Sequence, residues 1–286
     1  MLKSLLSAHE EARLKAVKCL EYPFGRVHDA DPDLTSLVEA AALVCGTPIS
    51  LVTLVGEDMQ WFKAQVGLEG VHETSREVSF CAHTILEDQV FEIVDVMSDP
   101  RFAANPLVTG APDIRFYAGA PLTTHNGQNV GALCVIDTKP RQLTDDQRRI
   151  LLHLSKVASH ILESNRAAWQ HSLIAAELKA LNDSAPFGLY AADALGKCTQ
   201  VNPKWLEIYG RAEAESLGDG WWRGMHPEDR VRVEQAWSKT VAMGSDFDQE
   251  FRVLRPDGGR GSFGLWHDKW RAKMGVSSAL SARSKM

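Results

Sequence analysis

Residues 115–137 read RFYAGAPLTTHNGQNVGALCVID, two apolar runs separated by a polar turn. The Asn126-Gly127 pair in this turn supplies the positive φ angles that a tight hairpin connection needs. The second run, residues 130–136, stays apolar over the length expected of a strand that is covered on both faces. The stretch therefore predicts a buried β-hairpin.

The two arms of this hairpin, residues 116–122 and 131–137, resemble the closing hairpin of a GAF domain. Earlier segments continue the likeness in order along the chain: residues 48–55, 60–64, 79–85, 90–96, 99–102 and 105–108. The pattern is similar to the GAF subgroup of bacterial sensor kinases and diguanylate cyclases, and it covers roughly half the chain. The resemblance implies an α+β domain, an antiparallel sheet flanked by helices, that binds a small molecule.

Composition excludes several classes of protein. The 286 residues suffice for two ordinary domains, and a net charge of −6 without a basic cluster argues against a nucleic-acid partner. The apolar stretches are strand-length, far short of the ~20 residues that cross a bilayer, so no membrane partner is expected. Five cysteines without a C-x-x-C pair suit a reducing compartment. We expect a cytoplasmic protein.

Periodicity divides the chain into an N-terminal helix at 1–20, a GAF domain at 21–142 and a long helix at 143–182. The long segment lacks Gly and Pro, and Thr144 with Gln147 forms a capping-box pattern at its start. Its apolar positions recur at spacings of three to four, which favours a parallel coiled coil and a homodimer. A shorter, broken helix folding back on the GAF core explains the same spacing. The positions are Ile150, Leu154, Val157, Ile161, Ala168, Leu173, Leu178 and Leu181.

Residues 185–191 and 198–203 resemble the opening hairpin of a PAS domain, with Asn202 expected to cap a helix that has Pro203 at its first position. The likeness continues through residues 247–258 and then stops. We therefore expect a partial PAS domain at 183–258, with a sheet lacking two of its five strands, and an atypical tail at 259–286. Either the tail is an unusual substitute or the reading frame changes near Gly259 and cuts a longer sensor short. The abrupt end favours the second explanation.

Cys81 and His83 are the sharpest candidates for chemistry. On a helix, positions two apart point to different sides, so a metal site or a nucleophile–base pair is hard to build from them. A small core cysteine and a surface or hydrogen-bonded histidine are the simpler interpretation. Redox sensing by Cys81 needs only thiolate character and access, and it stays open. We expect no catalytic residue and no metal.

Aromatic side chains over the sheet could stack on a planar ligand, and Arg101 or Arg115 could pair with an anionic group on it. The alternative is that the aromatic residues are core and that Asp95 only ends a strand. The candidate ligand-binding residues are Trp61, Phe80, Cys81, His83, Asp95, Phe102, Arg115 and Tyr117. Because pocket lining varies within the family, the resemblance names neither ligand nor cofactor.

The sequence shows no glycine-rich phosphate loop, no His-Glu-x-x-His, no kinase phosphoacceptor helix and no diguanylate cyclase signature. It therefore predicts a sensor module for signal transduction without its own catalytic output, which a histidine kinase or cyclase partner would supply. The alternative is an enzyme resembling the GAF-fold reductases of free methionine sulfoxide. Those reductases need two or more cysteines at the pocket, whereas only Cys81 is expected there and Cys134 lies in a buried strand.

Overall fold

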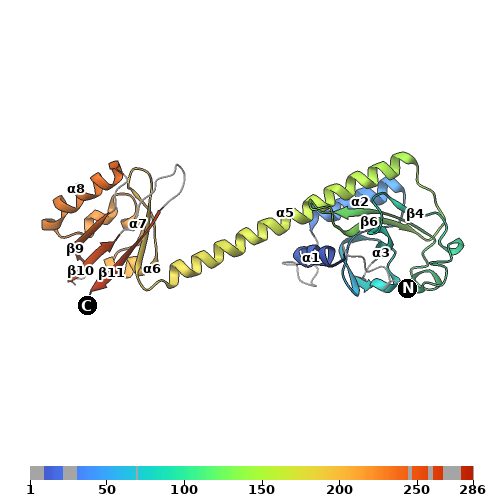
Figure 1. The fold of residues 1–286 in the computed structure, drawn as a ribbon, viewed down its shortest axis with the longest axis horizontal. Helices are drawn as coiled ribbons and strands as arrows, with labels where there is room; N and C mark the ends of the chain where they lie inside the picture. The colour runs from blue at the N-terminus through green and yellow to red at the C-terminus, as the bar shows by residue number, and fades with distance from the viewer. Residues whose placement is uncertain are drawn as a thin grey trace. The chain divides into compact units, whose positions relative to one another are not determined.

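The computed structural model describes residues 10–21, 31–68, 70–243, 247–256, 260–266 and 278–285, so residues 1–9 of the expected N-terminal helix lie outside it. The chain divides into two compact units, residues 1–171 and 172–286 (Figure 1).

The first unit is built on a six-stranded antiparallel sheet in the order β3-β2-β1-β6-β5-β4. The predicted hairpin is confirmed as β5 and β6, which pair with each other and lie between β1 and β4. Gly131 lets β1 approach, since a Cβ there would lie 1.8 Å from the Thr53 carbonyl oxygen. The strands are β1 (Ile49–Val55), β2 (Met59–Val66), β3 (Glu73–Ser75), β4 (Phe91–Ile93), β5 (Phe116–Thr123) and β6 (Asn129–Asp137).

The turn of this hairpin differs from the prediction in one respect. Gly127 has a φ of 75°, but Asn126 does not have a positive φ. The connection is longer than two residues, because the Thr124 N–H donates to the Gln128 carbonyl and the Gly127 N–H donates back to Thr124. Only one left-handed residue is then required.

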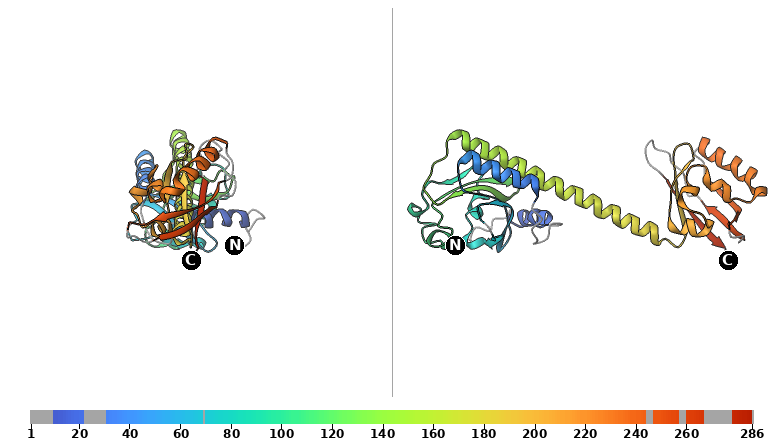
Figure 2. Two further views of the ribbon diagram at one scale, coloured as in Figure 1. Left: turned by 90° about the vertical axis from the view of Figure 1, so that its left-hand side faces the viewer. Right: turned by 180° about the vertical axis from the view of Figure 1, so that it is seen from behind.

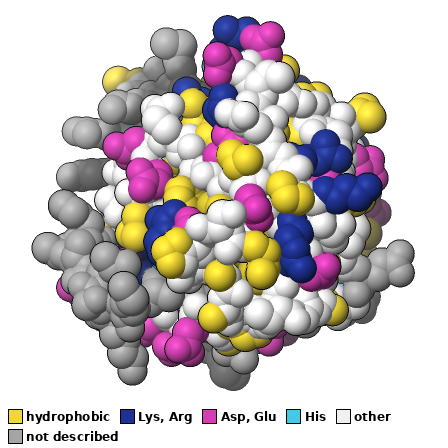
Figure 3. Space-filling model, turned by 90° about the vertical axis from the view of Figure 1, so that its right-hand side faces the viewer, with side chains coloured by type: hydrophobic (Ala, Val, Ile, Leu, Met, Phe, Trp, Pro, Cys, Tyr) yellow, Lys and Arg dark blue, Asp and Glu magenta, His cyan; other side chains and the backbone are white. Residues whose placement is uncertain are grey.

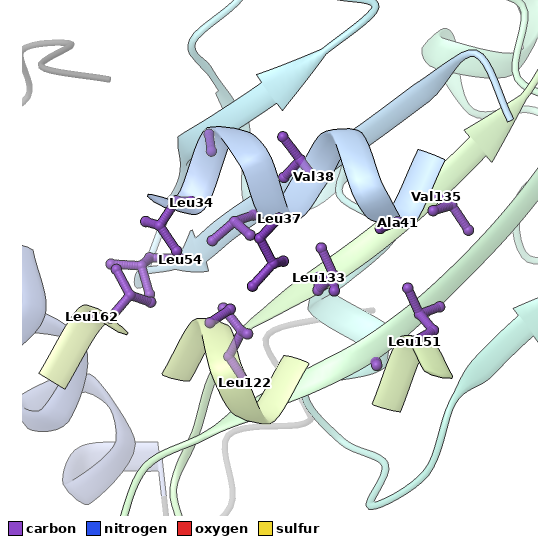
Figure 4. Packing of buried hydrophobic residues seen from close by; sticks show 14 of the residues in the cluster. Leu34, Leu37, Val38, Ala41, Leu54, Leu122, Leu133, Val135, Leu151 and Leu162 are labelled. Atoms are coloured by element: carbon purple, nitrogen blue, oxygen red, sulfur yellow. The ribbon is translucent and has the colours of Figure 1, made fainter. Parts of the chain in front are cut away.

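One face of this sheet is covered by α2 (Pro32–Cys45) and the first half of α5 (Asp145–Ser184), which lie side by side (Figure 2), and Val17 and Leu20 join the same core. Every second residue of a strand points to this face, such as Leu133 and Val135 of β6. Figure 4 shows them packed against Leu37 and Leu151. The other face carries short elements: α3 (Cys81–Thr84), α4 (Pro106–Thr109) and the 3-10 turns η2 (Arg76–Val78) and η3 (Val96–Ser98).

Helix α1 (Glu10–Glu21) is fixed by a buried cluster of charges. Glu10 accepts hydrogen bonds from Arg13 at 2.7 Å and from Arg76 at 2.6 Å. Arg13 also donates to the Val55 carbonyl at 2.6 Å, and Arg76 to the Gly56 carbonyl at 2.9 Å. Burial works to raise the pKa of Glu10, but the bonds from both arginines outweigh it and hold this pKa below its usual 4.5. The cluster ties α1 to the β1–β2 turn.

Helix α5 is unbroken over 40 residues and begins with the predicted capping box, in which Thr144 and Gln147 exchange hydrogen bonds. Leu154 and Ile161, expected in a dimer seam, are instead half-buried against the core of the first unit. Ile150 and Val157 remain exposed. Further along, the exposed fractions of four apolar side chains lie between 51% and 62%: Leu173, Ile174, Leu178 and Leu181.

The second unit contains a five-stranded antiparallel sheet in the order β8-β7-β11-β10-β9. Its strands are β7 (Gly188–Ala192), β8 (Cys198–Val201), β9 (Asp248–Leu254), β10 (Arg260–Trp266) and β11 (Ser278–Lys285). Its helical elements are α6 (Pro203–Tyr209), α7 (Glu213–Ser216), η4 (Gly220–Gly224) and α8 (Pro227–Met243).

Strands β10 and β11 correct the expectation of a sheet without its last two strands. Strand β10 pairs with β9, and β11 pairs with both β10 and β7. These two strands could not be recognised in the sequence, because residues 260–266 and 278–285 show no clean alternation of apolar and polar side chains. Strand pairing uses backbone N–H and C=O groups, which do not depend on that alternation. A changed reading frame near Gly259 stays a prediction.

Asn202 caps α6 as predicted and also does more. Its side-chain oxygen accepts from the backbone N–H groups of Trp205 at 2.9 Å and Leu189 at 2.8 Å. Its side-chain nitrogen donates at 3.0 Å to the carbonyls of Asn182 and Phe187. One fully buried amide thus joins the end of α5, the start of β7 and helix α6.

Candidate functional site

The face of the six-stranded sheet opposite α2 and α5 carries a cluster of aromatic rings. Phe80 stacks on Phe102, with ring centroids 4.6 Å apart, and on Tyr117, at 5.2 Å. His83 meets Phe102 edge-on at 4.8 Å, and Phe91 of β4 lies 6.1 Å from Tyr117. Strand β5, the start of α3 and the loop after η3 therefore bring together four of the predicted site residues.

A charged pair lies over two of these rings. The Arg101 guanidinium is 5.4 Å from the Phe91 centroid and 5.3 Å from the Phe102 centroid, within the range of cation–π attraction. Arg101 also pairs with Asp99 at 2.6 Å, and its hydrogen bond lowers the pKa of that carboxyl. The Arg101 side chain is 52% exposed, so its guanidinium is accessible to another anion. A shallow depression of about 640 Å³ adjoins it, lined by residues 92–95 and 98–101.

His83 is held neutral at this site. Burial is the main cause that lowers the pKa of its imidazole, and the nearby positive charge of Arg101 adds to it. A neutral imidazole both donates and accepts one hydrogen bond, so His83 could contact a polar ligand without adding charge.

Two cysteines meet beneath the aromatic rings. The sulfur atoms of Cys81 and Cys134 are 3.8 Å apart, and the Tyr117 hydroxyl donates to Cys81 at 3.4 Å. Both thiols are free and buried. The hydrogen bond from Cys134 is the largest cause that lowers the pKa of Cys81 to about 7, while burial opposes it. The same contact and burial raise the pKa of Cys134.

Gly119 makes the position of the Tyr117 hydroxyl possible. A Cβ at Gly119 would lie 2.3 Å from that hydroxyl and 2.6 Å from the Thr84 hydroxyl. These two hydroxyl groups are hydrogen-bonded at 2.6 Å. The missing side chain thus leaves room for a small polar patch around the Cys81 sulfur in an otherwise apolar core.

The remaining predicted residues lie elsewhere or are engaged. Trp61 packs on the opposite side of the sheet, with the core beneath α2 and α5. Asp95 caps η3 by accepting from the Met97 N–H at 3.1 Å and the Ser98 hydroxyl at 3.0 Å.

Arg115 donates to the carbonyls of Val108 and Ile114 and pairs with Asp113 at 2.5 Å. Its guanidinium therefore fixes the end of α4, and among the candidate cations Arg101 is the more accessible one.

Cys134 was missed as a neighbour of Cys81. The alternation of side chains along a strand could have indicated this contact. Cys134 points to the same side of β6 as Ala132 and Ile136, and α3 covers that side. Its register partner in β5 is Gly119, which has no side chain to separate the two sulfurs. The residues that the structure describes hold no group of three or more potential metal ligands.

The interior of the second unit is also aromatic. Trp205, Tyr209 and Trp221 are buried. Tyr190 lies 5.0 Å from Trp205, measured between ring centroids, and Trp237 donates to the Gly196 carbonyl at 3.2 Å.

Comparison with known proteins identifies both units. A family model for the GAF domain matches residues 29–162, and one for the PAS fold matches residues 199–260. The chain therefore carries a GAF domain followed by a PAS domain, two sensory domains. The PAS match ends at residue 260, close to the point where the resemblance in the sequence stops.

One relative is a Pseudomonas aeruginosa protein named cyclic di-GMP phosphodiesterase, 45% identical over 129 residues. The match covers 45% of this chain, and the chain spans only 22% of that relative's length.

Two solved structures are similar to the chain. The GAF domain of an Acinetobacter phosphoenolpyruvate-protein phosphotransferase is 16% identical, with a TM-score of 0.42 over 57% of this chain and 97% of that one. A free methionine-R-sulfoxide reductase of Thermoplasma acidophilum is 13% identical, with a TM-score of 0.40 over 47% and 93%.

Two surface observations complete the description. On the face of the GAF unit in Figure 3, acidic and basic side chains are interspersed. No helix in the described part of the chain has the length and apolar character that spanning a membrane requires.

Proposed function

We propose that this chain is a cytoplasmic sensor module whose GAF domain binds a small planar ligand with an anionic group. The observation that carries the proposal is the Arg101 guanidinium lying over the rings of Phe91 and Phe102. Because the rings of Phe80, Phe102 and Tyr117 are buried, such a ligand would approach Arg101 from the depression beside it, and its anionic group would replace Asp99 as the partner of Arg101. His83, neutral and beside Phe102, would supply a hydrogen bond.

The proposed output is regulatory. Helix α5 begins in the GAF domain and ends before the first PAS hairpin, where Asn202 donates a hydrogen bond to its last turn. A shift of α5 would therefore move the residues bonded to Asn202. The exposed apolar positions of its second half would pair two copies in a homodimer. The named relative suggests cyclic di-GMP signalling as the pathway, in which a partner cyclase, phosphodiesterase or histidine kinase would act on the signal.

The test is a calorimetric titration of the full chain with a fixed panel, cyclic GMP and cyclic di-GMP. We expect at least one to bind, and Arg101→Gln to weaken that binding by about tenfold or more, since a charge-assisted contact is lost. The matched control is Arg149→Gln, because Arg149 makes a similar pair with Asp146 at 2.7 Å on α5. Binding of neither nucleotide, or equal binding by the Arg101 variant, would contradict the proposal.

The meeting of Cys81 and Cys134 favours a second candidate, reduction of free methionine sulfoxide. It revises the expectation that Cys81 stands alone at the pocket. The test is consumption of dithiothreitol that depends on methionine-R-sulfoxide and is abolished by Cys81→Ser. Absence of sulfoxide-dependent turnover in the reduced full chain would eliminate this candidate.

A further inference from the structure

We propose that Cys81 and Cys134 form a redox-responsive thiol pair, which a hydroperoxide converts into a disulfide. The sulfur atoms are already 3.8 Å apart, although 53 residues separate them in the chain. The sulfur–sulfur bond of a disulfide is about 2.05 Å long, so the two sulfur atoms must approach each other by about 1.75 Å. This modification does not depend on the identity of the GAF ligand.

The surroundings of Cys81 differ from those of an ordinary buried cysteine. Burial raises the pKa of a thiol, and together with the nearby negative charge of Glu92 it raises the pKa of Cys45 to about 11. Cys81 instead has the hydroxyl of Tyr117 as a donor and the Cys134 thiol within hydrogen-bonding distance. Hydroxyl donors stabilise a thiolate, which is the reactive form of cysteine. Cys81 is therefore the attacking sulfur and Cys134 the resolving one.

The reaction balances without any other redox partner. The Cys81 thiolate attacks one oxygen of hydrogen peroxide, breaks the O–O bond and becomes a sulfenic acid, and the departing hydroxide takes up the proton that Cys81 released. The Cys134 sulfur then attacks the Cys81 sulfur, and the sulfenic hydroxyl leaves as water with the Cys134 proton. In total, two thiols and one peroxide give one disulfide and two waters.

Movement on closure is expected on the side of α3. Cys134 lies in β6, which is paired to β1 on one side and β5 on the other. Cys81 begins a helix of only four residues. Drawing Cys81 toward the sheet would also move His83, whose ring rests on Phe102. Oxidation would thereby change the positions of side chains in the aromatic cluster. This change affects ligand binding only if the proposed function holds.

Both sulfurs are almost inaccessible, with Cys81 2% and Cys134 0% exposed. Peroxide must therefore enter through local opening of the short elements around α3. The disulfide should form more slowly than oxidation of an exposed thiol.

The experiment treats the folded full chain with millimolar hydrogen peroxide, blocks remaining thiols under denaturing conditions and maps the peptides by mass spectrometry. We expect one main cross-linked product, the disulfide between Cys81 and Cys134. Its amount should be at least about tenfold greater than that of any other cysteine pair, and dithiothreitol should reverse it. In a Cys19→Ser/Cys45→Ala/Cys198→Ala background, the intact mass should fall by two hydrogens, and the added Cys134→Ser should replace the disulfide with a dimedone-trapped Cys81 sulfenic acid.

Two results would overturn the proposal. One is retention of both free thiols after a treatment that oxidises Cys19, which is only half-buried. The other is oxidation of Cys81 in the unmodified chain without a bond to Cys134. Because peptide mapping uses the unmodified chain, the answer does not depend on the folding of any variant.

Discussion

The Tyr117 hydroxyl donates a hydrogen bond to the Cys81 sulfur across 3.4 Å, from strand β5 to the first residue of helix α3. The same hydroxyl is 2.6 Å from that of Thr84, at the other end of this helix. One phenol group therefore holds both ends of α3 to the sheet and, after the larger contribution of the Cys134 thiol, helps to lower the pKa of Cys81.

Replacing Tyr117 with Phe should slow oxidation of Cys81 at neutral pH. The fraction of Cys81 in the thiolate form increases as the pH rises through the pKa of this thiol. The oxidation rate of the unmodified chain should therefore be half-maximal near pH 7. Without the hydroxyl donor, the midpoint should move toward the ordinary 9.0. The measurement is the rate of peroxide oxidation against pH. Tyr190→Phe, a buried tyrosine in the PAS unit, is the control, and an unchanged midpoint in Tyr117→Phe would refute the assigned role.

Gly119→Ala should destabilise the GAF unit by about 1–3 kcal/mol, because the added methyl group would overlap the hydroxyls of Tyr117 and Thr84. Urea unfolding followed by circular dichroism measures the loss. Combined with Tyr117→Phe, which removes the nearest atom, the cost should be less than the sum of the two single changes. If the two losses of stability were strictly additive, the methyl group added at position 119 would not be crowded by the Tyr117 hydroxyl.

Glu10→Gln should lower the free energy of unfolding by about 3 kcal/mol at pH 7, since it leaves Arg13 and Arg76 buried without their carboxylate. The pKa of Glu10 is lowered in the folded chain, so its contribution is full above about 4.5 and is lost as pH falls through the lower folded-state pKa. Denaturation at pH 7 and at successively lower pH should show the unmodified chain and the variant converging in acid. Glu11→Gln, an exposed neighbour, is the control; a constant difference at all pH values would contradict the assignment.

Helix α5 should hold two copies of the chain together. Ile174→Glu with Leu178→Glu places charge on side chains that are 54% and 61% exposed in the single chain, and it should give a monomer. Lys179→Glu, also on the exposed second half, should leave the dimer intact. Sedimentation velocity makes the comparison, and a monomeric unmodified chain would rule the dimer out.

Asn202→Ala should destabilise the PAS unit by about 3 kcal/mol, because the amides of Leu189 and Trp205 and the carbonyls of Asn182 and Phe187 lose their partner. Hydrogen exchange should show faster exchange in α6 and β7. Asn182→Ala is the matched control, since only the main chain of Asn182 takes part. Similar losses in both variants would mean that side-chain packing, and not this set of hydrogen bonds, stabilises the junction.

Local signals were sufficient for much of this architecture. The apolar runs around Asn126-Gly127 located the central hairpin, Thr144 and Gln147 located the start of α5, and the Asn202-Pro203 pair located α6.

The site depended on information that the sequence does not carry locally. Trp61 and Phe62 necessarily point to opposite faces of β2, but both faces are covered by apolar cores, so the pattern did not tell which face holds the site. The approach of Cys81 to Cys134 depends on where α3 rests on the sheet, a tertiary placement between residues 53 positions apart.

The four bonds of Asn202 all end on main-chain atoms. Side chains at positions 182, 187 and 189 can therefore change in evolution without breaking any of them, whereas the amide itself has few substitutes. An aspartate would turn two donated hydrogen bonds into contacts between oxygen atoms, and a leucine of similar shape would satisfy none of the four groups. Among descendants of this sequence, we expect the junction to persist through changes at positions 182, 187 and 189 and to fail when position 202 changes.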